Sequence, residues 1–146
     1  MINTLFSKNH AILGSIMSLV FNDDFYNNHH ISNIRNSIYL AVEHDKCFVH
    51  RVNGEILGYC TWGFFTRDEI ERDLWDGNDV FARDWSKDLI LFFPKFQCRA
   101  GRREVMRFVK DIQDFMFKNY PNCDGYGDRL YVNNNSRRGK WHRKVA

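Results

Sequence analysis

Apolar residues recur at helical spacing in three stretches of the chain. The first covers residues 7–21, where Ser7 can cap the helix, and the second covers residues 32–43. The third and clearest covers residues 104–119 and is followed by Pro121 as a stop signal. Its apolar stripe consists of Val105, Phe108, Val109, Ile112, Phe115 and Met116. The pattern therefore predicts two helices near the start of the chain and one long helix after residue 100.

Between these helices the pattern changes to that of strands. Residues 46–52 alternate, Asn53-Gly54 follows, and residues 56–65 read as a returning strand. Asn-Gly is a strong hairpin signal because both turn positions favour positive φ. The apolar run 89–93 reads as a buried central strand that Pro94 ends. The sequence thus predicts a hairpin and a separate central strand.

Three shorter elements complete the prediction. Residues 68–74 form a short acidic helix, and residues 129–133 and 139–145 form two late strands. The order is helix, helix, hairpin, acidic segment, central strand, long helix, strand, strand. This order predicts an α/β sandwich with a mixed, mostly antiparallel sheet flanked by helices, as in a GNAT-type acyltransferase domain.

Length and composition narrow the class of protein further. The chain has 146 residues, of which 44% are apolar and 16% aromatic, so residues 1–146 suffice for a single globular domain. No apolar run approaches the roughly 18 residues of a membrane span, and we see no secretory signal. The four cysteines show no CxxC spacing, and two lie in predicted strands, which favours buried free thiols. We therefore expect a cytoplasmic protein.

Charge is unevenly distributed along the chain. Residues 66–88 are rich in acids, whereas residues 129–146 contain six lysines and arginines and no acid after Asp128. A basic end of this kind can contact a nucleic acid, an acidic protein or a phosphorylated cofactor. It is equally consistent with a solvated tail. Its single Trp141 gives only weak support for stacking on nucleic-acid bases.

Several short motifs occur together in a specific order. They are Leu13-Gly14, Gly58-Tyr59-Cys60-Thr61-Trp62, Ala82-Arg83-Asp84-Trp85, Lys118-Asn119-Tyr120-Pro121 and Gly139-Lys140. In order and spacing the chain resembles the RTX toxin-activating lysine acyltransferases, the hemolysin-activating family. The resemblance implies a GNAT-like enzyme that transfers a fatty acyl group from acyl carrier protein, or from coenzyme A, to a lysine of a protein substrate. It also implies a possible homodimer.

The same resemblance points to the catalytic region. The family uses a histidine after the first helix as base or acyl acceptor, and an aspartate in the central strand that orients it. Aligned without gaps, Tyr26 and Leu91 occupy these two positions. His29 and His30 lie nearest to the first position and are candidate bases, since an imidazole accepts a proton at neutral pH. Tyr26 is a candidate donor to the departing thiolate, or a packed aromatic residue.

Residues before the long helix are candidates for holding the acyl donor. GNAT enzymes place a glycine-rich loop here that binds the pyrophosphate of coenzyme A at a helix N-terminus. Here the loop carries one glycine, Gly101, together with Arg99, Arg102 and Arg103. These arginines suit a phosphopantetheine phosphate and an acidic carrier protein; the other interpretation is a solvent-facing basic turn. No cofactor is expected to be tightly bound.

Two other chemistries receive little support from the sequence. Adjacent histidines such as His29 and His30 rarely ligate one zinc ion, and no spaced partner completes a set, so we expect no metal site. Cys60 lies in an apolar strand without a nearby base and is expected to be structural. Because both family catalytic positions are replaced, a second interpretation is open. The protein would then be a binding module without catalysis, an inhibitor or adaptor of phage or mobile-element type, that contacts nucleic acid or an acidic protein.

Overall fold

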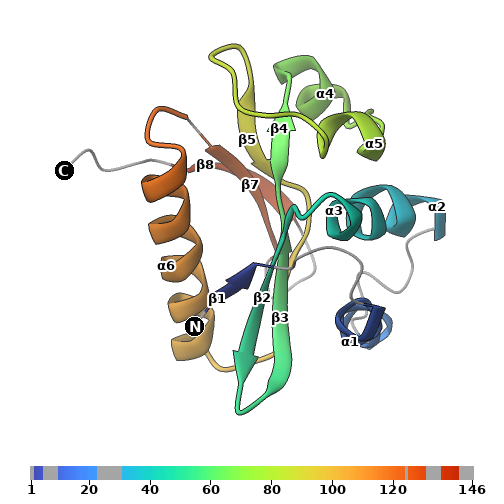
Figure 1. The fold of residues 1–146 in the computed structure, drawn as a ribbon, viewed down its shortest axis with the longest axis vertical. Coiled ribbons are helices and arrows are strands. Elements are labelled where there is room, and N and C mark those ends of the chain that lie inside the picture. The colour runs from blue at the N-terminus through green and yellow to red at the C-terminus, as the bar shows by residue number, and fades with distance from the viewer. Residues whose placement is uncertain (1, 5–9, 23–30, 124, 131–135, 142–146) are drawn as a thin grey trace.

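The computed structural model describes residues 2–4, 10–22, 31–123, 125–130 and 136–141 (Figure 1). The helices are α1 (His10–Phe21), α2 (Ile31–Ile34), the π-helical segment η2 (Arg35–Tyr39), α3 (Leu40–Glu43), α4 (Arg67–Arg72), α5 (Gly77–Val80) and α6 (Arg102–Asn119). The strands are β1 (Ile2–Thr4), β2 (Cys47–Val52), β3 (Glu55–Thr61), β4 (Gly63–Phe65), β5 (Ile90–Phe93), β6 (Phe96–Cys98), β7 (Gly125–Leu130) and β8 (Ser136–Trp141).

The three predicted long helices are present. The second is continuous from α2 to α3 and contains five residues of π-helix in its middle. In α6 the side chains of Phe108, Ile112 and Met116 are buried, and their spacing of four places them on one face. The chain leaves the helix at Tyr120, just before Pro121. The start of the first helix at Ser7 lies outside the described residues.

Two local signals set the turn and the acidic helix. Asn53 and Gly54 adopt φ values of 52° and 82°, which confirms the predicted hairpin between β2 and β3. Thr66 caps α4: its hydroxyl accepts a hydrogen bond from the Glu69 N–H, and the Glu69 carboxylate accepts one from the Thr66 N–H. This capping box begins the helix at Arg67, one residue before the predicted start.

The strands form two four-stranded sheets. Their orders are β1-β2-β3-β6 and β4-β5-β7-β8, and every pair is antiparallel except β5 with β7. Helix α6 lies in the connection that joins the two parallel strands, β5 and β7. Figure 1 shows α6 on one side of the strands and α1, α2 and α3 on the other. The predicted class, a mixed and mostly antiparallel α/β fold flanked by helices, is confirmed.

Pro94 ends the central strand, as the sequence predicts, since β5 runs from Ile90 to Phe93. After Pro94 and Lys95 the chain continues as β6, which pairs with β3. The register shifts by one residue here: Cys60 lies opposite Phe96, but Gly63 lies opposite Phe92, where an unshifted register would require Phe93. The extra residue is a β-bulge, and Pro94 is suited to it because proline has no N–H to pair.

The boundaries of four other elements also differ from the prediction. The short strand β1 and the single-turn helix α5 were not expected. Strand β7 begins at Gly125 instead of residue 129, and β8 begins at Ser136 instead of residue 139. Residues 131–133 and 142–145 of the two predicted late strands lie outside the described residues. Within the described ranges, no helix is long and apolar enough to cross a membrane.

The core consists of three clusters, two of which lie on opposite faces of the β2–β3 hairpin. Alternation along β2 sends Cys47 and Val49 toward α1 and sends Phe48 toward α6. On the α6 side the cluster includes Leu91 and Phe93 of β5, while Phe96 and Cys98 of β6 pack against it. The residues that face α6 have odd numbers in β5 and even numbers in β6. The extra residue of the bulge allows this change, so that apolar side chains face α6 along both strands. A third cluster joins α3 and α5 to β4 and β5.

Deletion of Pro94 should disrupt the fold, whereas Pro94→Ala should be tolerated. Removing one residue would turn Phe96 toward α1 and the side chain of Gln97 toward α6. We expect a loss of at least about 3 kcal/mol in the free energy of unfolding for the deletion, and a change of about 1 kcal/mol or less for Pro94→Ala. Chemical denaturation followed by near-UV circular dichroism measures both. Equal stability of the two variants would contradict the bulge.

Candidate functional site

Gly58, the first residue of the motif Gly58–Trp62, lies where a side chain would be crowded. A Cβ at this position would lie 3.0 Å from the carbonyl oxygen of Gln97 and 3.2 Å from both the Cys98 Sγ and the Phe108 ring. The position lies between His50 of β2 and Cys98 of β6 in the strand register. The absence of a side chain thus allows the ring of Phe108 on α6 to approach the sheet.

The next residues of the motif have structural partners. Tyr59 is fully buried, and its hydroxyl donates a 2.6 Å hydrogen bond to Gln97, whose amide donates a 3.1 Å bond to the Leu19 carbonyl. This network joins β3 and β6 to α1. Cys60 is also buried, and burial raises the pKa of its thiol well above the ordinary value. A thiol of this kind stays protonated at neutral pH, as expected for a structural residue.

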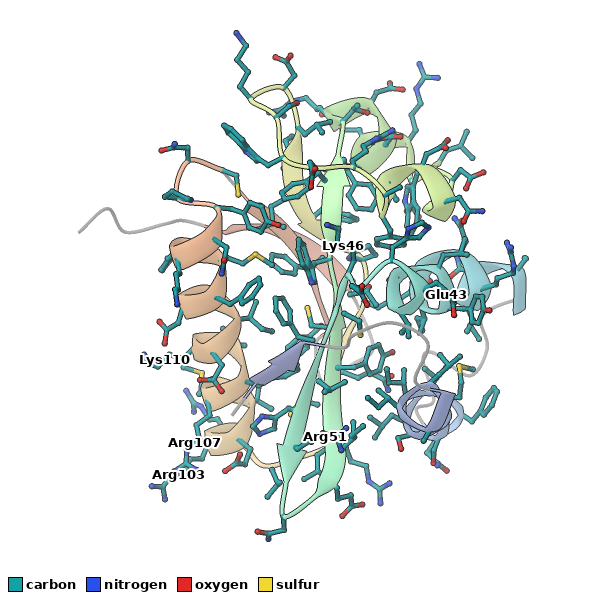
Figure 2. The ribbon with its side chains drawn as sticks, in the orientation of Figure 1. Glu43, Lys46, Arg51, Arg103, Arg107 and Lys110 are labelled. Carbon is teal, nitrogen blue, oxygen red and sulfur yellow. The ribbon has the colours of Figure 1, made fainter. Side chains whose placement is uncertain are left out.

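Trp62 stands at the break between β3 and β4. Its backbone N–H donates to the Lys46 carbonyl at 2.9 Å, and the Lys46 Nζ lies 4.6 Å from the Trp62 ring centroid and 5.6 Å from that of Phe64. Burial lowers the pKa of Lys46, and Asp84 and Asp45 oppose this shift. Figure 2 shows Lys46 near the centre of the molecule. Thus the motif's tryptophan holds a half-buried cation on its face.

Arg83, from the motif Ala82-Arg83-Asp84-Trp85, connects the acidic helix α4 to the sheet. Its Nη1 and Nη2 donate to the two carboxylate oxygens of Glu69 at 2.6 and 2.9 Å, and Nη1 also donates to the Phe64 carbonyl at 3.2 Å. This fork geometry is the strong form of a charge-assisted pair. The hydrogen bonds from Arg83 are the main reason that the pKa of Glu69 is lowered.

The position of the family's aspartate lies in the apolar core. Leu91 is 1% exposed and packs in the cluster beneath α6, which also includes Phe64 and Phe108. Asp88, the carboxylate closest in sequence, is exposed in the turn before β5. Strand β5 itself carries no acid. No carboxylate of this strand can therefore orient a catalytic base.

The three candidate catalytic residues cannot be placed. Tyr26, His29 and His30 all lie in the segment 23–30, outside the described residues. The segment joins the end of α1 to the start of α2. The roles assigned to these residues remain predictions from the sequence.

A buried histidine that the sequence analysis missed pairs with α6. The Nε2 of His50 lies 2.7 Å from Oε2 of Glu104, whose other oxygen accepts a 3.1 Å hydrogen bond from Arg107. The hydrogen bond with His50 is the main reason that the pKa of Glu104 is lowered. His50 is 2% exposed, and its Nδ1 has no partner among the described residues. The pair resembles a catalytic dyad, but its burial keeps it from a substrate, so we read it as a tie between β2 and α6.

The predicted donor-binding residues lie around the N-terminus of α6. Gly101 is the N-cap, is exposed, and has open space where a Cβ would be. Arg102 and Arg103 are exposed in the first turn, with no ion partner among the described residues. Arg99 precedes the cap, and its N–H donates a 2.7 Å hydrogen bond to the Leu57 carbonyl. All four residues therefore belong to one short connection that is open to a ligand.

A groove lies between α1 and the β2–β3 hairpin, and we call it the hairpin groove. Its volume is about 630 Å³. Two arginines line it, Arg51 from β2 and Arg99 from the connection before α6, together with the single acid Glu55. Its apolar lining comes from Ile12, Leu19, Ile56 and Leu57. The groove thus combines positive charge with apolar surface, and sequence analysis had identified only Arg99 in it.

Metal chemistry has no support in the described part of the chain. No group of three or more histidine, cysteine, aspartate or glutamate side chains in that part is arranged to hold a metal ion. The four cysteines are free there, and three of them are buried.

Comparison with known proteins identifies the class to which this fold and site belong, an acyltransferase-like domain. The model of the RTX toxin acyltransferase family matches residues 6–141. The chain belongs to that family, as the motifs predicted. No curated protein matches the chain significantly.

A search of solved structures finds a similarity to an N-acetyltransferase from Staphylococcus aureus Mu50. The alignment covers 92% of this chain and 83% of that chain, with 11% sequence identity and a TM-score of 0.40.

Removal of Arg83 should destabilise the protein in a pH-dependent way. We expect Arg83→Met to lower the free energy of unfolding by about 2 kcal/mol at neutral pH, because two charge-assisted bonds are lost from a largely shielded pair. Since the pKa of Glu69 is held below its usual 4.5, this stabilisation is complete above that pH and disappears as the pH falls through the folded-state value. Urea denaturation between pH 7 and pH 3 measures the difference.

The exposed pair of Arg72 with Asp68 provides the control, since surface pairs contribute little. Arg72→Met should change the stability by about 0.5 kcal/mol or less at every pH. A difference between wild type and Arg83→Met that stays constant into acid would show that Glu69 is not the partner that matters.

Proposed function

We propose that the protein takes a fatty acyl group from acyl carrier protein and forms an amide on a lysine of a protein substrate. Membership of the RTX toxin acyltransferase family supports acyl transfer. The observation that favours a carrier protein as donor is the exposed, unpaired charge of Arg102 and Arg103 at the N-terminus of α6. The binding-module alternative is not favoured by family membership.

Charge at the start of α6 supports an acidic partner. Cations at a helix N-terminus interact unfavourably with the helix dipole, so these arginines lower the stability of the helix. A role in binding an acidic partner would account for this cost. Arg103, Arg107 and Lys110 follow one side of α6 and point away from the sheet (Figure 2). Arg107 and Lys110 are already paired, with Glu104 and Asp114 respectively. Arg102 and Arg103 are therefore the free charges that can meet the acidic surface of the carrier protein.

The reaction needs a base and a route for the leaving thiol. The lysine amine attacks the thioester carbonyl, a C–N bond forms, and the C–S bond breaks to release the thiol of the donor. His29 or His30 accepts the proton that the amine loses, and Tyr26 donates to the departing thiolate. The burial of Leu91 and the exposure of Asp88 support a base that acts without an aspartate from β5.

The double variant His29→Ala, His30→Ala should abolish acyl transfer while the donor still binds. We expect a loss of at least about 100-fold in rate, the contribution of a general base. Intact-mass analysis of the acceptor protein, with acyl carrier protein charged with chains of different length, measures transfer. His44→Ala, which changes a half-exposed histidine at the end of α3, is the matched control and should be active. Full activity of the double variant would rule out both histidines as the base.

Reversing charge at the start of α6 should separate binding from folding. The double variant Arg102→Glu, Arg103→Glu should weaken binding of acyl carrier protein at least about ten-fold, and the loss should shrink at high salt. The same variant should be as stable as wild type or more stable, because acids suit a helix N-terminus. Titration calorimetry and thermal denaturation measure the two effects.

Reversal of Arg67 and Arg72 on α4 keeps the same net charge change away from α6 and serves as the control. If both double variants weaken binding equally, the effect is general charge and not a docking site at α6.

A further inference from the structure

We infer that the hairpin groove binds the phosphorylated arm of the acyl donor, with Arg51 and Arg99 on its phosphate and the apolar lining against the thioester and acyl end. This inference rests on the proposed function and deepens it. It adds Arg51, β2 and the open side of α1 to a donor site that the sequence confined to residues 99–103.

The two arginines are the first observation behind this inference. Arg51 comes from β2 and Arg99 from the connection after β6, so they converge from segments almost fifty residues apart. Neither guanidinium has a hydrogen bond or ion partner among the residues that the structure describes. One guanidinium group can donate two parallel hydrogen bonds to the oxygens of a phosphate. Two unpaired guanidinium groups beside one groove therefore suit a phosphate ester.

Location is the second observation. The N–H of Arg99 is bound to the Leu57 carbonyl, which fixes the start of the α6 connection against the hairpin. Figure 2 shows Arg51 and Arg103 at the same end of the molecule. A ligand that leaves a carrier protein docked at the start of α6 would therefore pass Arg99 before it enters the groove.

The lining of the groove is the third observation. Helix α1 has no charged Asp, Glu, Lys or Arg side chain, so the side it turns to the hairpin is apolar or hydroxylic. Ile12, Leu19, Ile56 and Leu57 face the groove, and Ser15 and Ser18 line its α1 side. A volume of about 630 Å³ lies within the usual range for ligand sites.

Glu55 lets the sign of the interaction be tested. It is the one acid of the groove and lies at the exposed end of the hairpin. A carboxylate near a bound phosphate repels it, so Glu55→Gln should tighten binding of the donor. A positively charged ligand would instead bind more tightly to Arg51→Gln and less tightly to Glu55→Gln.

The test measures equilibrium binding of two probes, lauroyl-coenzyme A and lauroyl-acyl carrier protein, which share the phosphopantetheine arm. Arg51→Gln should weaken binding by about ten-fold, the usual effect of losing one charge-assisted contact. Ser18→Trp, which fills the groove from an exposed position of α1, should weaken the lauroyl probe more than its acetyl counterpart. Arg67→Gln and Asn78→Trp are the matched controls, and both should bind as wild type does.

Each outcome has a defined meaning. Weaker binding of both probes supports the groove as a site for the phosphopantetheine arm that they share. Weaker binding of one probe alone supports the groove as a site for the arm of that donor. Wild-type binding of both probes by Arg51→Gln and Ser18→Trp overturns the inference. In that case reversal of Arg102 and Arg103 still tests the proposed function, because neither residue lines the groove.

A diazirine at the end of the lauroyl chain gives a readout that does not depend on affinity. Cross-links mapped by mass spectrometry should fall on α1 and on residues 55–57. Labels confined to the α6 side of the sheet would also overturn the inference.

Discussion

The one-residue bulge at Pro94 is the constraint on which the arrangement of the site depends. Before it, β5 pairs with β4 and with β7; after it, β6 pairs only with β3. The two strands on either side of Pro94 thus belong to different sheets, and the one-residue shift in register changes which side chains face α6. The chain consequently leaves β6 at the hairpin end of the molecule. That exit places Arg99 beside the hairpin groove and Gly101 at the cap of α6.

Two buried polar contacts hold the helices in place on either side of this strand pair. Gln97 connects Tyr59 to the Leu19 carbonyl on one side, and His50 connects to Glu104 on the other. Buried polar groups cost free energy unless they are hydrogen-bonded, so each contact favours one position of its helix. The hairpin groove and the start of α6 owe their relative placement to both contacts. Tyr59 of the family motif thus helps to position α1 against the sheet.

The sequence predicts what depends on neighbouring residues. The Asn53-Gly54 turn, the start of α4 and the stripe of α6 all follow from local spacing, and each is present. What it missed depends on contacts between distant segments. Pro94 ends the central strand as predicted, but nothing nearby shows that β3 offers a partner to the residues beyond it, so β6 was not predicted. A three-residue strand such as β1 carries too little pattern to be recognised.

The same distinction holds for the site. Arg99, Gly101, Arg102 and Arg103 are consecutive or nearly so, and a family loop pointed to them. Arg51 joins Arg99 only when the hairpin folds back, and His50 meets Glu104 across 54 positions of sequence. No local motif in the sequence predicts that these residues come together.

Leu91 limits where the chemistry of this chain can lie. A carboxylate at its position would stand among aromatic rings of the cluster under α6, and burying a charge there without a partner is costly. The chain instead places leucine there and gains apolar packing for β5. Since β5 carries no acid and His50 is enclosed, neither the central strand nor the buried imidazole can exchange a proton with a bound substrate. We therefore propose that the base comes from neither of these two places. His29, His30 and Tyr26, which lie outside the described residues, remain the candidates that the resemblance to the family predicts. Helix α1 also forms one wall of the hairpin groove, so the same helix connects the proposed base to the proposed donor arm.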